Sequence, residues 1–200
     1  MIRLLHKLPR NLTVAFSGGV DSVAILNFLS NSHNVTAAFF HHGTDNSDSA
    51  YDFVISHCEQ YNIKLDVGYI DGTKPNDESW EEYWRNQRYK FLDKFEYVVT
   101  GHHLDDCIET YIWSALHGEP KVIPAIRNNV YRPFLLNNKS VFVDWCENKN
   151  LKYVQDNSNF DDKYMRNYIR NNMVELAYHV NPGLDKVVRK LILNSVENVN

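Results

Sequence analysis

The sequence contains few cysteines, and their spacing excludes two common kinds of cysteine site. Cys58, Cys107 and Cys146 are odd in number and far apart, and no CxxC pair occurs. A disulfide framework, or a four-thiolate zinc or iron–sulfur site, needs cysteines in pairs or at regular spacings. We therefore expect three reduced thiols, as in a cytoplasmic protein.

Long apolar runs are also missing. No segment approaches the roughly 20 apolar residues that a membrane-spanning helix requires, and residues 1–6 lack the apolar stretch of a secretory signal peptide. We expect no signal peptide and no contact with a membrane. Internal repeats are absent, as are a Walker A loop (G-x-x-x-x-G-K-[ST]) and a dinucleotide-binding G-x-G-x-x-G.

Positive charge is not in excess. The chain has 21 Lys+Arg and 25 Asp+Glu, and this net charge of −4 argues against a general nucleic-acid binder held by phosphate contacts. The charge is unevenly divided, however, because residues 1–120 carry a net −8 and residues 121–200 a net +4. We predict a boundary near residue 120 between a core at 1–120 and a basic, mostly helical extension of the same domain at 121–200.

Short apolar runs alternate with amphipathic segments of helical length. This alternation is typical of α/β proteins in which helices cover parallel strands. We predict a doubly wound, mainly parallel sheet with helices on both faces, followed by a small helical C-terminal part. The predicted strands are 12–16, 35–40, 65–69 and 97–100. The helix after the first strand ends near residue 29, and the helices after the other three span 47–61, 79–93 and 105–116. Further along the chain we predict a loop at 118–129, extended stretches at 130–135 and 151–155, and helices at 140–148, 164–178 and from Pro182 onward.

The strongest motif lies between the first predicted strand and its helix. Two glycines permit a tight turn and a close approach of a ligand to the backbone, and the N–H groups that start a helix attract an anion. At the carboxyl end of a parallel strand, such a loop predicts a phosphate-binding site, with a plain strand-to-helix turn as the alternative. The motif comprises Ser17, Gly18, Gly19, Val20, Asp21 and Ser22.

A second motif opens the predicted helix 105–116. Asp105, Asp106 and Glu109 lie at its start, where carboxylates interact favourably with the helix dipole. Asp105 and Glu109 are four residues apart on one face, and their repulsion predicts a cation between them. Mg²⁺ held through carboxylates and phosphates, or an ammonium group, would meet that need. His102 and His103 precede the helix, but no partner at metal-ligand spacing completes a zinc site.

Two further residue pairs are candidates for the same site. His41 and His42 end the second predicted strand, on the rim that carries the two motifs above, so one shared pocket explains them better than unrelated loops. Arg85 and Arg88 are three residues apart on the third predicted helix. Such a pair more often lies on a solvated face, and only a wider resemblance would favour a site.

The S-G-G-x-D-S motif resembles the PP-loop of the ATP pyrophosphatase superfamily, whose members activate a carbonyl as an adenylate. The remaining motifs are similar, in the same order, to those in the catalytic domain of the tRNA(Ile)-lysidine synthetases. The matching segments are SGGVDS at 17–22, HHG at 41–43, WRNQRYKF at 84–91, GHHLDDCIET at 101–110, YRPFL at 131–135 and DNSNFDDKYMRNYIRNNM at 156–173. We expect three departures from the family: the C-terminal tRNA-binding domains of its long members would be missing, Cys107 stands where Gln is common, and the segment 118–130 is short.

The resemblance implies a ligase that uses ATP, Mg²⁺, free lysine and a tRNA(Ile) with a CAU anticodon. ATP would adenylate O2 of the wobble cytidine with loss of pyrophosphate, and the lysine ε-amine would then attack C2 and expel AMP. The implied ATP-binding residues are 17–22 together with His41 and His103. The implied catalytic residues are Asp21, Asp105, Asp106 and Glu109, with Asp105 and Asp106 as magnesium ligands and with Arg85 and Arg88 neutralising the adenylate or a phosphate.

The basic half of the chain would face the RNA. A surplus of only +4 predicts weak, salt-sensitive binding, and an anticodon base drawn into a pocket fits single-strand recognition. The implied tRNA contacts are Arg132, Lys163, Arg166, Asn167 and Arg170. A homodimer is left open.

Three other functions were weighed. Thiolation of tRNA predicts a cysteine pair, which three dispersed cysteines do not provide. Small-molecule amidation of the NAD or GMP synthetase type predicts a need for ammonia or a glutaminase and no R-N-x-I-R segment. A binding module without enzymatic activity would need no acidic cluster facing an ATP loop.

Overall fold

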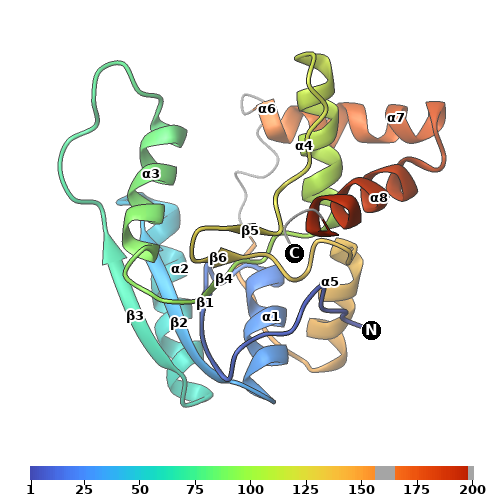
Figure 1. Ribbon diagram of the computed structural model, residues 1–200. Helices are drawn as coiled ribbons and strands as arrows, with labels where there is room; N and C mark the ends of the chain where they lie inside the picture. Colours follow the sequence, from blue (N-terminus) through green and yellow to red (C-terminus); the bar gives the residue numbers. More distant parts are fainter. Residues whose placement is uncertain (156–164, 198–200) are drawn as a thin grey trace.

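A mostly parallel six-stranded sheet forms the centre of the computed structural model, which describes residues 1–155 and 165–197 (Figure 1). The strand order is β3-β2-β1-β4-β6-β5, and only β5 runs antiparallel to its neighbour. The strands are β1 (Asn11–Ala15), β2 (Asn34–His41), β3 (Lys64–Tyr69), β4 (Val98–Val99), β5 (Ile126–Arg127) and β6 (Val130–Tyr131). The predicted α/β class and mainly parallel sheet are confirmed.

Helices cover both faces of this sheet because successive strand residues point to opposite sides. On β2, Ala37 and Phe39 join the core cluster of α1, α2 and α5, whereas Ala38 and Phe40 join the cluster that contains Phe91 of α3. The helices that flank the sheet are α1 (Val20–Ser30), α2 (Asp45–Gln60), α3 (Trp80–Leu92) and α5 (Lys139–Asn148). Strands buried on both sides explain why the sequence shows continuous apolar runs there.

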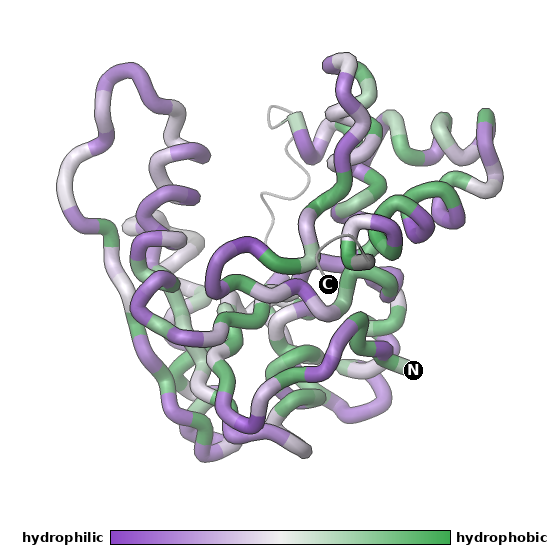
Figure 2. The backbone as a smooth tube through the Cα atoms, viewed as in Figure 1, coloured by the Kyte–Doolittle hydropathy of each residue, from purple (hydrophilic) through white to green (hydrophobic). Residues whose placement is uncertain are grey.

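A separate apolar cluster holds the C-terminal helices against α4 (Leu104–Leu116). The C-terminal helices are α6 (Met165–Tyr168), the π-helical turn η2 (Ile169–Met173), α7 (Val174–Val180) and α8 (Leu184–Glu197), and the last three contribute residues to the cluster. On α8, Leu184, Val188 and Ile192 recur every fourth residue and are buried. Hydrophobic and hydrophilic residues alternate along this helix (Figure 2), as expected of one that buries a single stripe.

The structure corrects several predicted boundaries. The single helix expected at 164–178 is divided by η2, because a π-helical turn widens the helix within the arginine-bearing segment. The loop expected at 118–129 ends in β5, which pairs with β6 through a turn where Asn128 has φ +55°. The stretch 151–155 forms no strand. Helix α2 begins two residues early because the Thr44 hydroxyl accepts a hydrogen bond from the Ser47 N–H.

The order of the strands determines where a ligand would bind. β1 lies between β2 and β4, so the chain leaves β1 toward one side of the sheet and later returns to the other. The carboxyl ends of β1 and β4 therefore flank the point where the order reverses, which is the usual ligand position in open α/β sheets. Within the described ranges, no helix combines the length and apolarity needed to cross a membrane.

Candidate functional site

The loop between β1 and α1 is built to expose backbone N–H groups. Gly18 adopts φ +81°, a conformation that disfavours other residues, and a Cβ there would lie 3.1 Å from the Phe53 ring. The Ser22 hydroxyl donates to the Gly19 carbonyl at 2.9 Å and accepts from the Ser17 N–H at 3.3 Å. Gly19 is the N-cap of α1, and no side chain caps this terminus. The first N–H groups of α1 are thus available to an anion.

Two other segments hold this loop in place. The Val154 N–H donates to the Gly18 carbonyl at 2.9 Å, so the chain after α5 buttresses the loop. A Cβ on Gly101, in the loop after β4, would lie 3.3 Å from Ile25 and 3.6 Å from the Cβ of Asp21. This close approach brings the two predicted motifs together. The sequence reasoning missed Val154, because an irregular segment has no pattern that marks such a contact.

His103 connects the two loops. Its backbone N–H donates to Asp106 Oδ2 at 2.9 Å and its Nδ1 accepts from the Asp106 N–H at 3.4 Å, which forms a reciprocal cap on α4. Its Nε2 lies 3.7 Å from Asp21 Oδ1. Burial would lower the pKa of His103, but the nearby carboxylates of Asp105, Asp106 and Asp21 outweigh burial and raise it. The ring is thus held among carboxylates from both loops.

Asp21 has an oxygen that the described residues leave without a hydrogen bond. Oδ1 is buried, and its contact with His103 is too long for a hydrogen bond. Burial raises the pKa of this carboxyl, although the charges of His103 and Lys139 oppose the shift. A buried carboxylate oxygen without a partner is costly unless a ligand completes it. Asp21 is therefore the strongest candidate to bind a cation or a donor group of a ligand.

Asp105 lies at the mouth of the same site. Its Oδ2 accepts a hydrogen bond from the Lys139 N–H at the start of α5, at 2.8 Å. Its side chain is 42% exposed. Burial would raise the pKa of Asp105, but the His103 side chain and the Lys139 N–H stabilise the ionised form and lower it. Asp105 is thus a charged carboxylate that a soluble cation can reach.

Two arginines neutralise the acidic face of α4. Arg166 donates to Asp106 Oδ1 at 3.0 Å and to Glu109 Oε2 at 2.9 Å. Arg170 donates to the two oxygens of Glu109 at 2.6 and 3.1 Å. Glu109 is only 2% exposed, and its charge helps to raise the pKa of Arg170 against the effect of burial. We call Asp106, Glu109, Arg166 and Arg170 the ion-pair cluster.

The ion-pair cluster revises two predictions. We expected a cation between Asp105 and Glu109, and in the structure two arginines of the same chain bind Glu109. Mg²⁺ or an ammonium group at Asp105 stays a prediction. Asp106 is engaged by His103 and Arg166, so the geometry does not favour it as a magnesium ligand. No group of three or more His, Cys, Asp or Glu side chains suited to a metal ion occurs in residues 1–155 and 165–197.

The predicted RNA contacts fall into different environments. Arg166 and Arg170 have side chains that are 45% and 30% exposed, so both reach the surface despite their ion pairs. Asn167, between them, is half-buried. Arg132 is 2% exposed and donates to the Pro124 carbonyl at 2.9 Å and the Tyr89 hydroxyl at 3.1 Å. This position disfavours Arg132 as an RNA contact, because its guanidinium is engaged in the interior. Lys163 lies outside the described residues.

The histidines and the helix-α3 arginines line the neighbouring part of the rim. His41 Nε2 lies 2.9 Å from Asp48. Burial and the nearby charge of Arg88 lower the pKa of His42 to about 4, so this ring is neutral near pH 7. The guanidinium carbons of Arg85 and Arg88 lie 5.3 and 5.8 Å from the centre of the Tyr89 ring. No hydrogen bond or ion pair among the described residues joins His41 or Arg85 to the ion-pair cluster.

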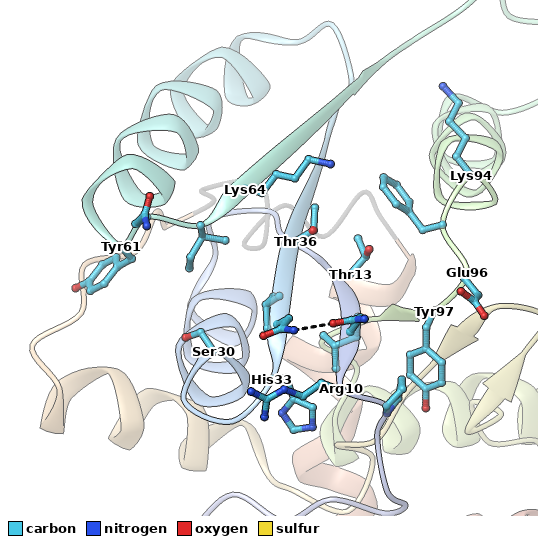
Figure 3. Close-up of a pocket in the computed structure, with 18 residues that line it drawn as sticks. Arg10, Thr13, Ser30, His33, Thr36, Tyr61, Lys64, Lys94, Glu96 and Tyr97 are labelled. Carbon is cyan, nitrogen blue, oxygen red and sulfur yellow. Dashed lines mark hydrogen bonds between the residues drawn. The ribbon is translucent and has the colours of Figure 1, made fainter.

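A hollow of about 940 Å³ lies at the opposite edge of the sheet (Figure 3). Its walls include Asn11, Asn34 and Lys64, which begin β1, β2 and β3. No predicted site residue lines it. The candidate site is therefore the rim formed by the carboxyl ends of the strands. There the loop of residues 17–22, which we call the phosphate loop after its predicted role, meets His103 and the ion-pair cluster.

Curated relatives share most of this chain's length. A tRNA(Ile)-lysidine synthase from Thermotoga sp. (strain RQ2) is 30% identical over an alignment of 201 positions, which covers 91% of this chain and 49% of that protein. Proteins of the same name from Francisella tularensis subsp. novicida and Xylella fastidiosa are 28% and 27% identical over 91% and 88% of this chain, and 50% and 44% of their own length. The chain thus spans about half the length of the curated relatives it matches.

The fold has a counterpart among solved structures. The NH3-dependent NAD synthetase from Campylobacter jejuni superposes with a TM-score of 0.51 at 14% identity, over 97% of this chain and 88% of that one. At that identity the likeness concerns the fold alone. The family model for the PP-loop domain matches residues 3–177 and so includes every motif of the rim. This chain belongs to the PP-loop domain family.

Proposed function

We propose that this protein ligates lysine to C2 of the wobble cytidine in a tRNA(Ile) with a CAU anticodon, at the expense of ATP. One observation carries the proposal. At the same edge of the sheet, the start of α1 has N–H groups that no side chain caps, and the acidic helix α4 has carboxylates that Arg166 and Arg170 neutralise. Relatives that share about nine-tenths of the chain are named tRNA(Ile)-lysidine synthase. ATP would be converted to AMP and pyrophosphate.

The phosphate loop would bind the triphosphate through the N–H groups at the start of α1 and the Ser17 and Ser22 hydroxyls. Asp21 fits a divalent cation, because its buried Oδ1 has no hydrogen-bond partner among the described residues. A bound Mg²⁺ would neutralise the phosphates, held by Asp21 and by oxygens of the nucleotide itself. His103 would keep Asp21 oriented from the other side.

The two chemical steps need charge in two different places. In the first, O2 of the cytidine attacks the α-phosphorus and pyrophosphate departs, so cationic groups near the phosphates stabilise the transition state. Arg88, half-buried beside Tyr89, would be one of these groups. In the second, the lysine amine attacks C2 and AMP leaves. Asp105 is ionised and partly exposed, so it would attract the lysine ammonium before the amine loses its proton.

The ion-pair cluster would present the RNA with ordered guanidinium groups. Glu109 fixes both arginines while leaving part of each at the surface. A held guanidinium loses less conformational freedom when it binds a phosphate. Glu109 is thus a positioning residue in this proposal, and a direct role toward the lysine ammonium would require it to release the arginines.

The cysteines disfavour the thiolation alternative. Cys58, Cys107 and Cys146 are all buried. Burial raises their pKa to about 11, 12 and 11, so each is a protonated thiol near pH 7. A persulfide carrier or cluster ligand needs an accessible thiolate. An enzyme that amidates a small molecule would use the same phosphate loop. The experiment below distinguishes this alternative from lysine ligation.

The decisive experiment is the transfer of radiolabelled lysine to RNA. The protein is incubated with ATP, Mg²⁺ and a CAU-anticodon tRNA(Ile), and label is expected in the RNA. The same tRNA with the wobble cytidine replaced by uridine is the control and should gain no label. ATP consumption without lysine in any RNA would refute the proposal, and ammonia-dependent consumption with a small carboxylic acid would favour amidation.

A further inference from the structure

Helix α3 carries an aromatic stripe that leads away from the site. Trp80, Trp84 and Arg88 are spaced four residues apart and so share one face of the helix. The rings of Trp80 and Trp84 lie 5.6 Å apart at 35°, and Trp84 lies 6.0 Å from His42 on the rim of the sheet. The helix begins far from the sheet and descends toward it (Figure 1). The stripe therefore runs from an outer tip at Trp80 to the site.

The outer tip is exposed and held in position. Trp80 is 55% exposed, so much of its ring surface is accessible to a binding partner. Lys74 Nζ lies 5.5 Å from its ring centre and is itself fixed by the carbonyls of Pro75 and Glu78. Trp84 is half-buried, and no described residue accepts a hydrogen bond from its indole N–H. The two rings are thus positioned mainly by ring and cation contacts.

The charges around the stripe indicate which part of a nucleic acid it would fit. Glu81 and Glu82 follow Trp80 in the first turn of α3 and are exposed, and Lys74 Nζ lies at the Trp80 ring, so the tip has no surplus of positive charge for phosphates and suits flat, uncharged base faces. Arg88, at the inner end, supplies a positive charge close enough to His42 on the rim to help lower the pKa of that ring. Aromatic rings followed by a guanidinium are the usual means of holding unpaired nucleotides.

We propose that Trp80 and Trp84 form a stacking surface for the unpaired anticodon-loop nucleotides next to the reacting base, with Arg88 at its inner end. The inference rests on the proposed function for the identity of the RNA. It adds α3 to the predicted RNA contacts, which all lie beyond residue 130. Stacking on two rings would hold the loop open while one base enters the site.

The test measures binding of a fluorescently labelled CAU anticodon stem-loop by anisotropy. Since one base stacked on an aromatic ring contributes about fivefold to a hundredfold in affinity, Trp80→Ala should weaken binding by that factor and Trp80→Phe should restore most of it. Tyr61→Ala is the matched control, because Tyr61 is a 39% exposed aromatic on the hollow at the opposite sheet edge. It should bind as tightly as the wild type.

A second RNA separates stacking from other contacts. In a stem-loop whose loop nucleotides are abasic, the phosphates remain and the bases are gone, so Trp80→Ala and the wild type should bind equally weakly. ATP binding should be the same in all variants. The inference is refuted if Trp80→Ala binds the intact stem-loop as tightly as the wild type, or if the wild type does not bind it. Absence of lysine transfer together with Trp80-dependent binding would refute the proposed function and leave this inference standing.

Discussion

Replacement of Glu109 by glutamine should destabilise the fold while changing almost no volume. Glu109 is 2% exposed and accepts three charge-assisted hydrogen bonds from Arg166 and Arg170. The amide keeps one acceptor oxygen and turns an N–H₂ group toward a guanidinium. It also removes one of the two negative charges that balance two positive ones. Removing one partner of a buried ion pair costs about 3–5 kcal/mol, and the partial exposure of both arginines reduces this to roughly 2–4 kcal/mol.

The assay is thermal unfolding followed by circular dichroism. For a chain of this length, each kcal/mol lowers Tm by about 2–4 °C, so Glu109→Gln should unfold roughly 4–16 °C below the wild type. Glu119→Gln is the matched control, because the Glu119–Lys121 pair is exposed at 76% and 66% and its loss should leave Tm unchanged.

A double-mutant cycle distinguishes loss of the Glu109–Arg170 interaction from a general loss of stability. Arg170→Met alone should also destabilise, and the double variant Glu109→Gln/Arg170→Met should be more stable than the sum of the two single effects predicts, by about 1–3 kcal/mol. An unchanged Tm for Glu109→Gln would refute the reasoning, as would strictly additive effects.

Three further predictions concern other residues of the site and its surroundings. The folded protein raises the pKa of His103 above its ordinary 6.5, so the stability that this shift contributes is complete below pH 6.5 and is lost as pH rises through the folded pKa. The Tm advantage of the wild type over His103→Asn should therefore shrink as pH rises above 6.5, and a constant difference would contradict this. Asp21→Asn should keep or slightly raise Tm near pH 7, because it removes a charge that burial disfavours. The same variant should abolish ATP binding in a nucleotide titration, and normal ATP binding would exclude Asp21 from the site. Arg132→Met should lower the free energy of unfolding by about 1–3 kcal/mol in urea denaturation and leave RNA affinity unchanged, whereas a stable variant with weakened RNA binding would restore the RNA contact.

Local motifs were readable from the sequence because their causes are local. The phosphate loop needs glycine at a position of positive φ, and Gly18 has φ +81°. The start of α3 was predicted to within a residue because Ser79 is a favourable N-cap, whose hydroxyl accepts from the Glu82 N–H. The alternation of apolar runs and amphipathic segments was enough to predict the class of fold.

Errors arose where the deciding partner is distant in sequence or the element is short. β5 and β6 are two residues long, so no periodicity marks them, and only their pairing defines them. Arg132 resembled the other basic residues of its half. Its burial depends on Tyr89, 43 residues earlier, and on Pro124. Composition does not contain that information.

The sequence by itself determined the class of fold, through the alternation of apolar and amphipathic segments. It also determined the glycine turn at 17–22 and the acidic start of α4, because each follows from residues within one turn. It also indicated that the charge beside Glu109 required a cation. Only the tertiary structure decided which cation, since Arg166 and Arg170 lie 57 and 61 residues away and reach Glu109 once α6 and η2 are placed beside α4. The charge balance of a buried cluster depends on which segments pack together, and these segments are distant in the sequence.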